Sequence, residues 1–319
     1  MGKSDSLVFE VNRAKLSGPK SYQYRIRTNA HRFIHFLRRA KYGVQKWTKI
    51  SNRHFKAVAD EMKNEGLTDG RIAEVFSAAR HLCVVYENMS VSSTNADFDV
   101  SRGSITNQTS KAADPEVVST LISTLENVDP YLHAQRVAAQ VRLQYELGLR
   151  REEASKLDLV NDWNRDKRTL EVRYGTKGGR PRTLHGLSAK QTEALEKALP
   201  FVSKSNRPGI YNLMPEGMGD RWQNCLDYVA KKYGLTKKVL GYTLHGNRHE
   251  RFRQMYVDIA GFEPPNRFDA VATFQRNAES IAGDDWPTLD DRARDEIEVT
   301  AGHSAGRRDV SNAYLGSSY

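Results

Sequence analysis

The stretch HGNRH at residues 245–249 decides the interpretation of this chain, because it gathers two histidines and an arginine within little more than one helical turn. Side chains three and four positions apart lie on one face of a helix, so His245, Arg248 and His249 are expected to point the same way. Histidines at positions i and i+4 also form half of a common zinc motif. No third ligand stands at a recognisable spacing, and an arginine lies between the two histidines, so no metal site is expected.

Four further motifs flank this stretch in a fixed order and supply complementary chemistry. They are GLRREEA over 148–154 with Arg150, GTKGGR over 175–180 with Lys177, AGH over 301–303 with His303, and YL at 314–315 with Tyr314. A guanidinium can donate two parallel hydrogen bonds to phosphate oxygens, and fixed cations stabilise the charge that develops on those oxygens during attack. A tyrosine oxygen can act as the nucleophile. Together these side chains can cut and rejoin a phosphodiester without a metal or a cofactor.

In wording and order the motifs resemble the tyrosine recombinases, the family of phage integrases and Xer-type resolvases, over about residues 114–316. The resemblance implies that the protein cleaves and rejoins DNA through a 3′-phosphotyrosine intermediate. It implies that Arg150 and Arg248 bind the phosphate. It also implies that His245 and His303 transfer a proton or donate a hydrogen bond. Lys177 would protonate the departing 5′ oxygen, and Tyr314 would be the nucleophile. Glu153, which could hold Arg150, and His249 would support them.

Several alternatives stand beside this interpretation. Tyr242 and Tyr319 are rival nucleophiles, and a lysine in a basic turn is often only a phosphate contact. The glycines around Lys177 do not form a P-loop, because the GxxxxGK[ST] pattern is missing. At the level of function, a type IB topoisomerase would use nearly the same chemistry to relax supercoils, and a non-catalytic DNA-binding protein would not depend on Tyr314.

The charge of the chain indicates a polyanionic partner. The net charge is +10 with a pI near 9.5. Residues 268–299 contain nine acidic side chains against three arginines, a local charge of −6, so the remainder carries +16. Lysine and arginine neutralise DNA phosphates in a largely sequence-independent way. The expected DNA contacts are Arg25, Arg27, Arg38, Arg39, Lys41, Lys46, Lys49, Arg180 and Arg182.

The composition along the chain predicts a mainly α fold with a small β-sheet, arranged as two domains that clamp DNA. The predicted parts are a flexible arm over 1–19, a helical DNA-binding bundle over 20–92, a linker over 93–113 rich in Ser, Thr, Asn and Asp, and a catalytic domain over 114–319. Helical spacing of apolar residues supports the bundle. Within the catalytic domain, residues 169–173 and 182–185 alternate around a glycine-rich centre and predict a β-hairpin with Lys177 at its tip.

Three features depart from the family pattern, and the first is that Tyr314 follows His303 by eleven positions, a little more than is usual. Arg248 and His303 are 55 positions apart, and the excess includes the acidic segment 268–299, expected to be an insertion that contacts protein or shields the basic site. Only five residues follow Tyr314, so the C-terminal helix that many members pass to a neighbouring subunit is expected to be missing.

The remaining expectations concern partners and location. The resemblance implies double-stranded DNA with attachment or crossover sites, a homotetramer on that DNA, and an accessory DNA-bending or directionality protein. Integration or excision of a mobile element is favoured over chromosome-dimer resolution. The two cysteines, Cys83 and Cys225, lie far apart and are expected to pack rather than form a disulfide. Without an apolar signal core or a spanning segment, the protein is expected to be cytoplasmic and associated with a bacterial nucleoid.

Overall fold

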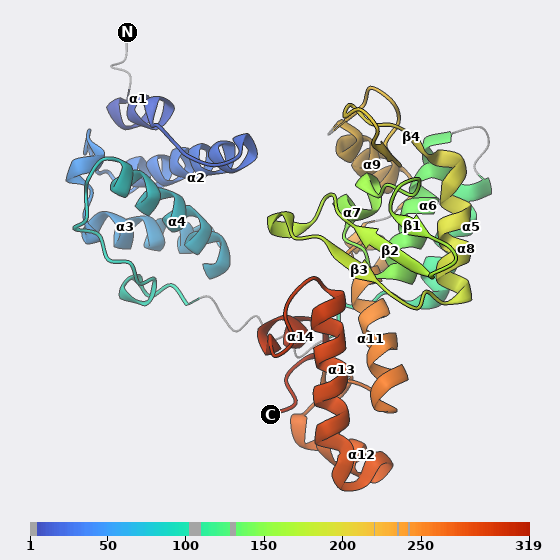
Figure 1. The fold of residues 1–319 in the computed structure, drawn as a ribbon. Coiled ribbons are helices and arrows are strands. Elements are labelled where there is room, and N and C mark those ends of the chain that lie inside the picture. The colour runs from blue at the N-terminus through green and yellow to red at the C-terminus, as the bar shows by residue number, and fades with distance from the viewer. Residues whose placement is uncertain (1–4, 102–109, 128–131, 220, 235, 242) are drawn as a thin grey trace. The chain divides into compact units, whose positions relative to one another are not determined.

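The chain divides into two compact units, Met1–Ser104 and Ile105–Tyr319 (Figure 1). This computed structural model describes residues 5–101, 110–127, 132–219, 221–234, 236–241 and 243–319. The predicted linker over 93–113 therefore lies partly outside the described residues, and Tyr242 lies wholly outside them. No helix among the described residues is long and apolar enough to cross a membrane.

The first unit is a helical bundle with an aromatic core. Phe33, Phe55 and Phe76 are fully buried, and their rings pack within 4.8–6.4 Å of one another, centroid to centroid. Such tilted and edge-on ring pairs add to the stability gained from burying apolar area. The elements are α1 (Ser6–Arg13), α2 (Lys20–Arg39), α3 (Asn52–Asn64) and α4 (Asp69–Val85), with 3₁₀ turns η1 (Trp47–Lys49) and η2 (Ala96–Phe98).

The prediction of a flexible arm over residues 1–19 is wrong for its described part. Residues 6–13 form α1, which begins at an N-cap where the Asp5 side chain accepts a hydrogen bond from the Leu7 amide. Leu7 and Val11, one helical turn apart, are fully buried in the core of the bundle. The segment is thus held by hydrophobic burial.

The second unit begins with helices packed around a small antiparallel sheet. Its three-stranded sheet has the order β1–β2–β3, and β4 and β5 form a separate antiparallel pair. Leu170 pairs with Leu184 across β2 and β3, so the predicted β-hairpin is confirmed. The elements are α5 (Pro115–Asn127), α6 (Leu132–Leu147), α7 (Arg151–Lys156), β1 (Trp163–Asn164), β2 (Thr169–Val172), η3 (Lys177–Gly179), β3 (Arg182–Leu184), α8 (Ala189–Ala198), η4 (Leu199–Phe201), β4 (Ser203–Lys204), β5 (Tyr211–Asn212) and α9 (Arg221–Lys232). The mainly α fold with a small sheet is likewise as predicted.

The unit ends in a layer of helices with a core of its own. Phe252, Tyr256, Phe274 and Ile297 are fully buried there. The elements are α10 (Lys237–Leu240), α11 (Gly246–Ala260), η5 (Pro265–Arg267), α12 (Val271–Ala282), η6 (Gly283–Asp285), α13 (Trp286–Thr300) and α14 (Arg308–Leu315). Helix α13 packs against both α11 and α14 (Figure 1). The acidic segment 268–299 is therefore part of this core, where it contributes Phe274, Ala293 and Ile297.

Candidate active site

The side chain of Arg248 is fully buried and joins three parts of the second unit. Its Nε donates a hydrogen bond to the Tyr314 hydroxyl at 2.9 Å, its Nη1 to the Gly148 carbonyl, and its Nη2 to the Ala301 carbonyl at 3.2 Å. Burial lowers the pKa of Arg248 to about 10, which leaves the guanidinium charged at neutral pH. The predicted nucleophile and the second predicted phosphate ligand are thus in direct contact, although 66 positions separate them.

The carboxylate of Glu153 organises the arginines around it. Arg182 donates to both of its oxygens at 2.8 Å, and Arg150 donates its Nη1 to Oε1 at 2.6 Å. Arg248 Nη1 lies 3.8 Å from Oε2. Burial would raise the pKa of Glu153, but the Arg182 hydrogen bonds and the surrounding cations prevail and hold it at about 2. One buried carboxylate thus fixes the direction of three guanidinium groups.

The local backbone places Glu153 where these arginines meet. The backbone amide of Arg150, the residue before α7, donates to Glu153 Oε2 at 2.7 Å. In the hairpin, Gly175 has a φ of +75°, and a Cβ at that position would lie 2.6 Å from the Glu152 carbonyl carbon. Only glycine permits both the left-handed backbone and this close approach. The base of the hairpin is therefore seated on α7.

Two histidines at the start of α11 pack beside Tyr314. The His249 and Tyr314 ring centroids are 4.9 Å apart, and those of His245 and Tyr314 are 6.1 Å apart. Burial, aided by Arg248 and other cations, lowers the pKa of His245 to about 4. Burial, aided by His245, lowers the pKa of His249 to about 3. Both imidazoles are therefore neutral at pH 7.

Five of the six predicted catalytic residues line one cavity of about 870 Å³, and the sixth, Arg248, donates a hydrogen bond to Tyr314 at its wall. The five are Arg150, Lys177, His245, His303 and Tyr314. His303 follows the end of α13, and its pKa is lowered by burial and by the nearby Arg150. Lys177 stands exposed in the hairpin at the start of η3. Side chains from four segments that are distant in sequence therefore converge on one opening.

The structure separates the predicted DNA contacts of the second unit into two kinds. Arg180 is exposed, as a surface contact requires. Arg182 is not: its side chain is only 7% exposed and is engaged with Glu153. Residues two apart in a strand share a face, and Leu184 is buried, so the strand pattern itself held the signal that Arg182 points inward. Its prediction as a surface contact is wrong.

The predicted contacts of the first unit also divide. Arg25, Lys41, Lys46 and Lys49 are exposed. Three arginines make hydrogen bonds or ion pairs within the unit, which leaves fewer of their N–H groups available to DNA phosphates. Arg38 pairs with Asp5 and donates to two carbonyls, Arg27 donates to the Ala14 carbonyl, and Arg39 pairs with Glu61 and Glu65.

The sequence reasoning missed three cations that also line the cavity. They are Lys111, Lys237 and Arg307. A usable signal was their closeness in sequence to the motifs, since Lys237 precedes His245 by eight positions and Arg307 follows His303 by four. Among the described residues, no group of three or more His, Cys, Asp or Glu side chains could hold a metal ion.

Comparisons with known proteins agree with this geometry. An integrase family model matches residues 101–235. An integrase of the Tn1549 transposon, solved with transposon right-end DNA, is 15% identical, with a TM-score of 0.53 over 90% of this chain and 98% of that one. The XerH recombinase bound to a palindromic difH substrate is 12% identical, with a TM-score of 0.51 over 81% and 79%. A lambda integrase dimer on a core site is 15% identical, with a TM-score of 0.51 over 96% and 75%. No curated protein matches the chain.

The fold is therefore that of the tyrosine recombinases. The match of an integrase family model to residues 101–235 agrees with the resemblance that the motifs carry.

Proposed function

We propose that this chain is a site-specific DNA recombinase that cleaves and rejoins DNA through a 3′-phosphotyrosine at Tyr314. The observation that carries the proposal is the 2.9 Å hydrogen bond from buried Arg248 to the Tyr314 hydroxyl, at the wall of a cavity lined by Arg150, His245 and His303. A cation beside a phenolic oxygen favours its development into a nucleophile. The same cation stabilises the phosphate that this oxygen attacks.

The chemistry follows from the positions of these groups. The Tyr314 oxygen bonds to phosphorus as the bond from phosphorus to the 5′ oxygen breaks, and Arg150 and Arg248 stabilise the extra charge on the non-bridging oxygens. The phenolic proton passes to the neutral imidazole of His245. The leaving 5′ oxygen takes a proton from Lys177 at the hairpin tip. Rejoining is the reverse attack by a 5′ hydroxyl, so the energy of the phosphodiester is conserved.

The number of subunits that act together follows from recombination, which needs more than one cleavage. Exchange of both strands between two duplexes requires four cleavages, so we propose that four copies act together on DNA. The transposon integrase among the structural relatives supports a mobile element as the substrate of this chain. We also propose that an accessory DNA-bending or directionality protein assists this reaction, and that the chain is associated with bacterial DNA.

Two rival functions are tested by the same reaction. The protein is incubated with supercoiled plasmids that carry fragments of DNA from its source, and the products are sequenced for new junctions. We expect junctions between plasmids with the wild-type chain and none with Tyr314→Phe. Relaxed plasmid without junctions would support a type IB topoisomerase, and tight binding without any strand breakage would support a DNA-binding protein.

A matched control separates the nucleophile from tyrosines in general. Tyr319 is 74% exposed and only five positions from Tyr314, so Tyr319→Phe should form junctions like the wild type. Loss of junctions in Tyr319→Phe but not in Tyr314→Phe would move the nucleophile to Tyr319.

A further inference from the structure

We propose that helix α13 positions the nucleophile, with buried Arg294 and Glu298 holding the two ends of α14 so that Tyr314 stays against Arg248. This inference rests on the proposed function. Arg294 and Glu298 are positioning residues, because no residue of α13 is among those described as lining the cavity.

Arg294 fastens the C-terminal end of α14. Its side chain is 2% exposed, and its Nη1 donates to Asn312 Oδ1 at 2.9 Å and to the Gly316 carbonyl at 3.1 Å. Its Nη2 donates to the Ser318 hydroxyl. These partners lie two residues before, two after and four after Tyr314, so one guanidinium contacts the chain on both sides of the nucleophile.

Asp290 fixes Arg294 in turn. Its Oδ2 accepts from Arg294 Nε and from the Ser318 hydroxyl, each at 2.8 Å, and its Oδ1 accepts from the Tyr256 hydroxyl at 2.6 Å. The buried carboxylate and the buried guanidinium neutralise each other, and both have several hydrogen-bond partners. A pair this fully bonded holds its geometry closely.

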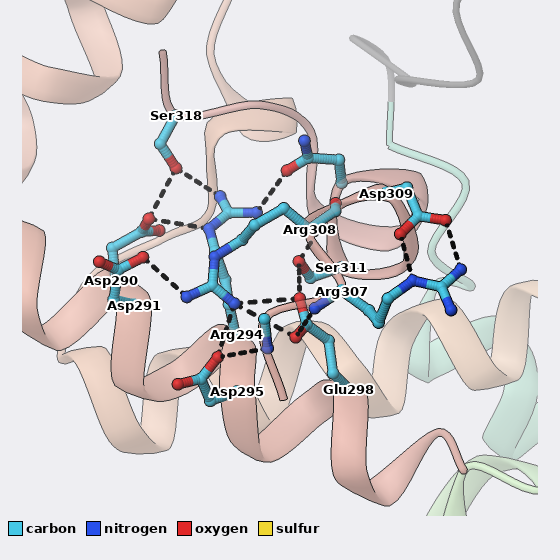
Figure 2. A network of polar contacts seen from close by, with 12 residues as sticks. Asp290, Asp291, Arg294, Asp295, Glu298, Arg307, Arg308, Asp309, Ser311 and Ser318 are labelled. Atoms are coloured by element: carbon cyan, nitrogen blue, oxygen red, sulfur yellow. Dashed lines mark hydrogen bonds and ion pairs between the residues drawn. The ribbon is translucent and has the colours of Figure 1, made fainter. Parts of the chain in front are cut away.

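Glu298 fastens the other end of α14. Its carboxylate, which is fully buried, accepts from the Ser311 hydroxyl at 2.7 Å, from the Arg307 amide at 2.7 Å and from Arg308 Nη1 at 3.1 Å. Arg308 also binds Asp295 and Asp291, which lie one and two turns before Glu298 on α13 (Figure 2). The start of α14 is thus tied to α13 as firmly as its end.

The residue after α13 links this clamp to the phosphate-binding arginines. The Ala301 carbonyl accepts from Arg150 Nη2 at 3.1 Å and from Arg248 Nη2 at 3.2 Å. Helix α13 therefore carries the groups that hold α14, and the residue that follows it, Ala301, provides the carbonyl that orients both arginines. Because attack requires the oxygen and the phosphate to be aligned within a fraction of an ångström, this shared support has direct consequences for rate.

These contacts also account for part of the acidity of the segment 268–299. Asp290, Asp291, Asp295 and Glu298 lie against Arg294, Arg307 and Arg308 of the same chain. Asp290 and Glu298 are buried, so these two acids cannot belong to the partner-binding or shielding surface that was expected of the acidic segment.

The test compares covalent cleavage with cleavage by a small nucleophile. Asn312→Ala removes one Arg294 contact and leaves the Asp290–Arg294 pair intact, while Arg294→Lys retains the charge and loses the planar fork. Exposed Glu296 on the same helix provides the control Glu296→Ala. Each variant is incubated with nicked, fragmented DNA from the source, and the rate of protein–DNA adduct formation is measured.

The same changes are then made in a Tyr314→Ala chain supplied with hydrogen peroxide. Its oxygen attacks phosphorus in place of tyrosine and needs no support from α14, while the arginines of the cavity are still required. Adduct formation should fall about 10- to 100-fold in Asn312→Ala and Arg294→Lys, a loss typical of a misplaced reacting group. It should not change in Glu296→Ala. Peroxide cleavage should be equal with and without Asn312→Ala or Arg294→Lys.

Unchanged adduct formation in both α13–α14 variants would overturn the inference. A parallel fall in peroxide cleavage would also overturn it, because the damage would then lie in the phosphate site. If the wild-type chain forms no adduct while its DNA binding is intact, the proposed function itself fails.

Discussion

Arg182 and Glu153 form a bidentate ion pair, with two hydrogen bonds of 2.8 Å, inside the second unit. The pair joins Arg182, in strand β3 of the hairpin, to Glu153 on α7, the helix that begins directly after Arg150. It therefore couples the position of Lys177, five residues earlier, to the arginine that is expected to bind phosphate.

Replacement of Arg182 by alanine should destabilise the second unit by about 3 kcal/mol, because it removes the strongest partner of a buried carboxylate. Urea unfolding measures the loss. Exposed Arg180, two positions away, provides the matched variant. Arg180→Ala should leave stability unchanged and reduce the salt slope of DNA binding by about 1. Equal stability of the two variants would show that the bidentate pair contributes little.

Stability at acid pH should depend on Glu153. Its pKa is about 2 in the folded chain, below the ordinary 4.5, so the folded chain binds fewer protons than the unfolded chain between these values. The stabilisation is fully present above about pH 4.5 and is lost as the pH falls toward 2, by about 3 kcal/mol in total. Unfolding by urea at pH 5, 4 and 3 should show this decline. Glu153→Gln should make the decline shallower; an identical decline in this variant would exclude Glu153 as a contributor.

The buried histidines should lower the stability of the fold at higher pH values than Glu153 does. His245 and His249 have pKa values of about 4 and 3, below the ordinary 6.5, so the unfolded chain again binds more protons. Stability should be greatest above pH 6.5 and fall toward pH 4, by up to about 1.4 kcal/mol per pH unit for each imidazole. In His249→Gln the decline between pH 6.5 and 5 should be shallower. A profile that is flat in the wild-type chain would show that these imidazoles are not neutral by burial.

In the first unit, lysines and arginines should behave differently. Lys46 and Lys49 are exposed, so the double change Lys46→Ala and Lys49→Ala should lower the salt slope of DNA binding by about 2 without affecting stability. Arg38→Ala should instead destabilise the bundle, because Arg38 pairs with Asp5 at 2.6 Å and donates to the Tyr42 and Val44 carbonyls. Thermal unfolding and DNA titration at several salt concentrations distinguish the two. A stable Arg38→Ala variant with weakened binding would reverse this assignment.

Much of the site could be predicted because its residues lie in short motifs whose order is readable. The hairpin was also predictable, since strand alternation and glycines at a turn are local signals. Local signals also suffice for α2 to α4, which are long enough to show helical spacing.

The sequence does not reveal which acidic side chains of the segment 268–299 face inward. Asp290 and Glu298 look like parts of an acidic patch, yet both are buried, because partners from other elements meet them: Tyr256 and Ser318 bond to Asp290, and Arg308 and Ser311 bond to Glu298. The burial of α1 was missed for a related reason. Two apolar residues, Leu7 and Val11, among polar neighbours are a weak pattern until the surface that covers them is known.

The most direct measurement is the position of the covalent DNA adduct. The protein is incubated with nicked, fragmented DNA from its source and denatured, and the DNA-linked peptide is identified by mass spectrometry. We expect a phosphodeoxynucleotide on Tyr314, absent in Tyr314→Phe and retained in Tyr319→Phe. An adduct on another tyrosine, or its persistence in Tyr314→Phe, would contradict the assignment of Tyr314 as the nucleophile.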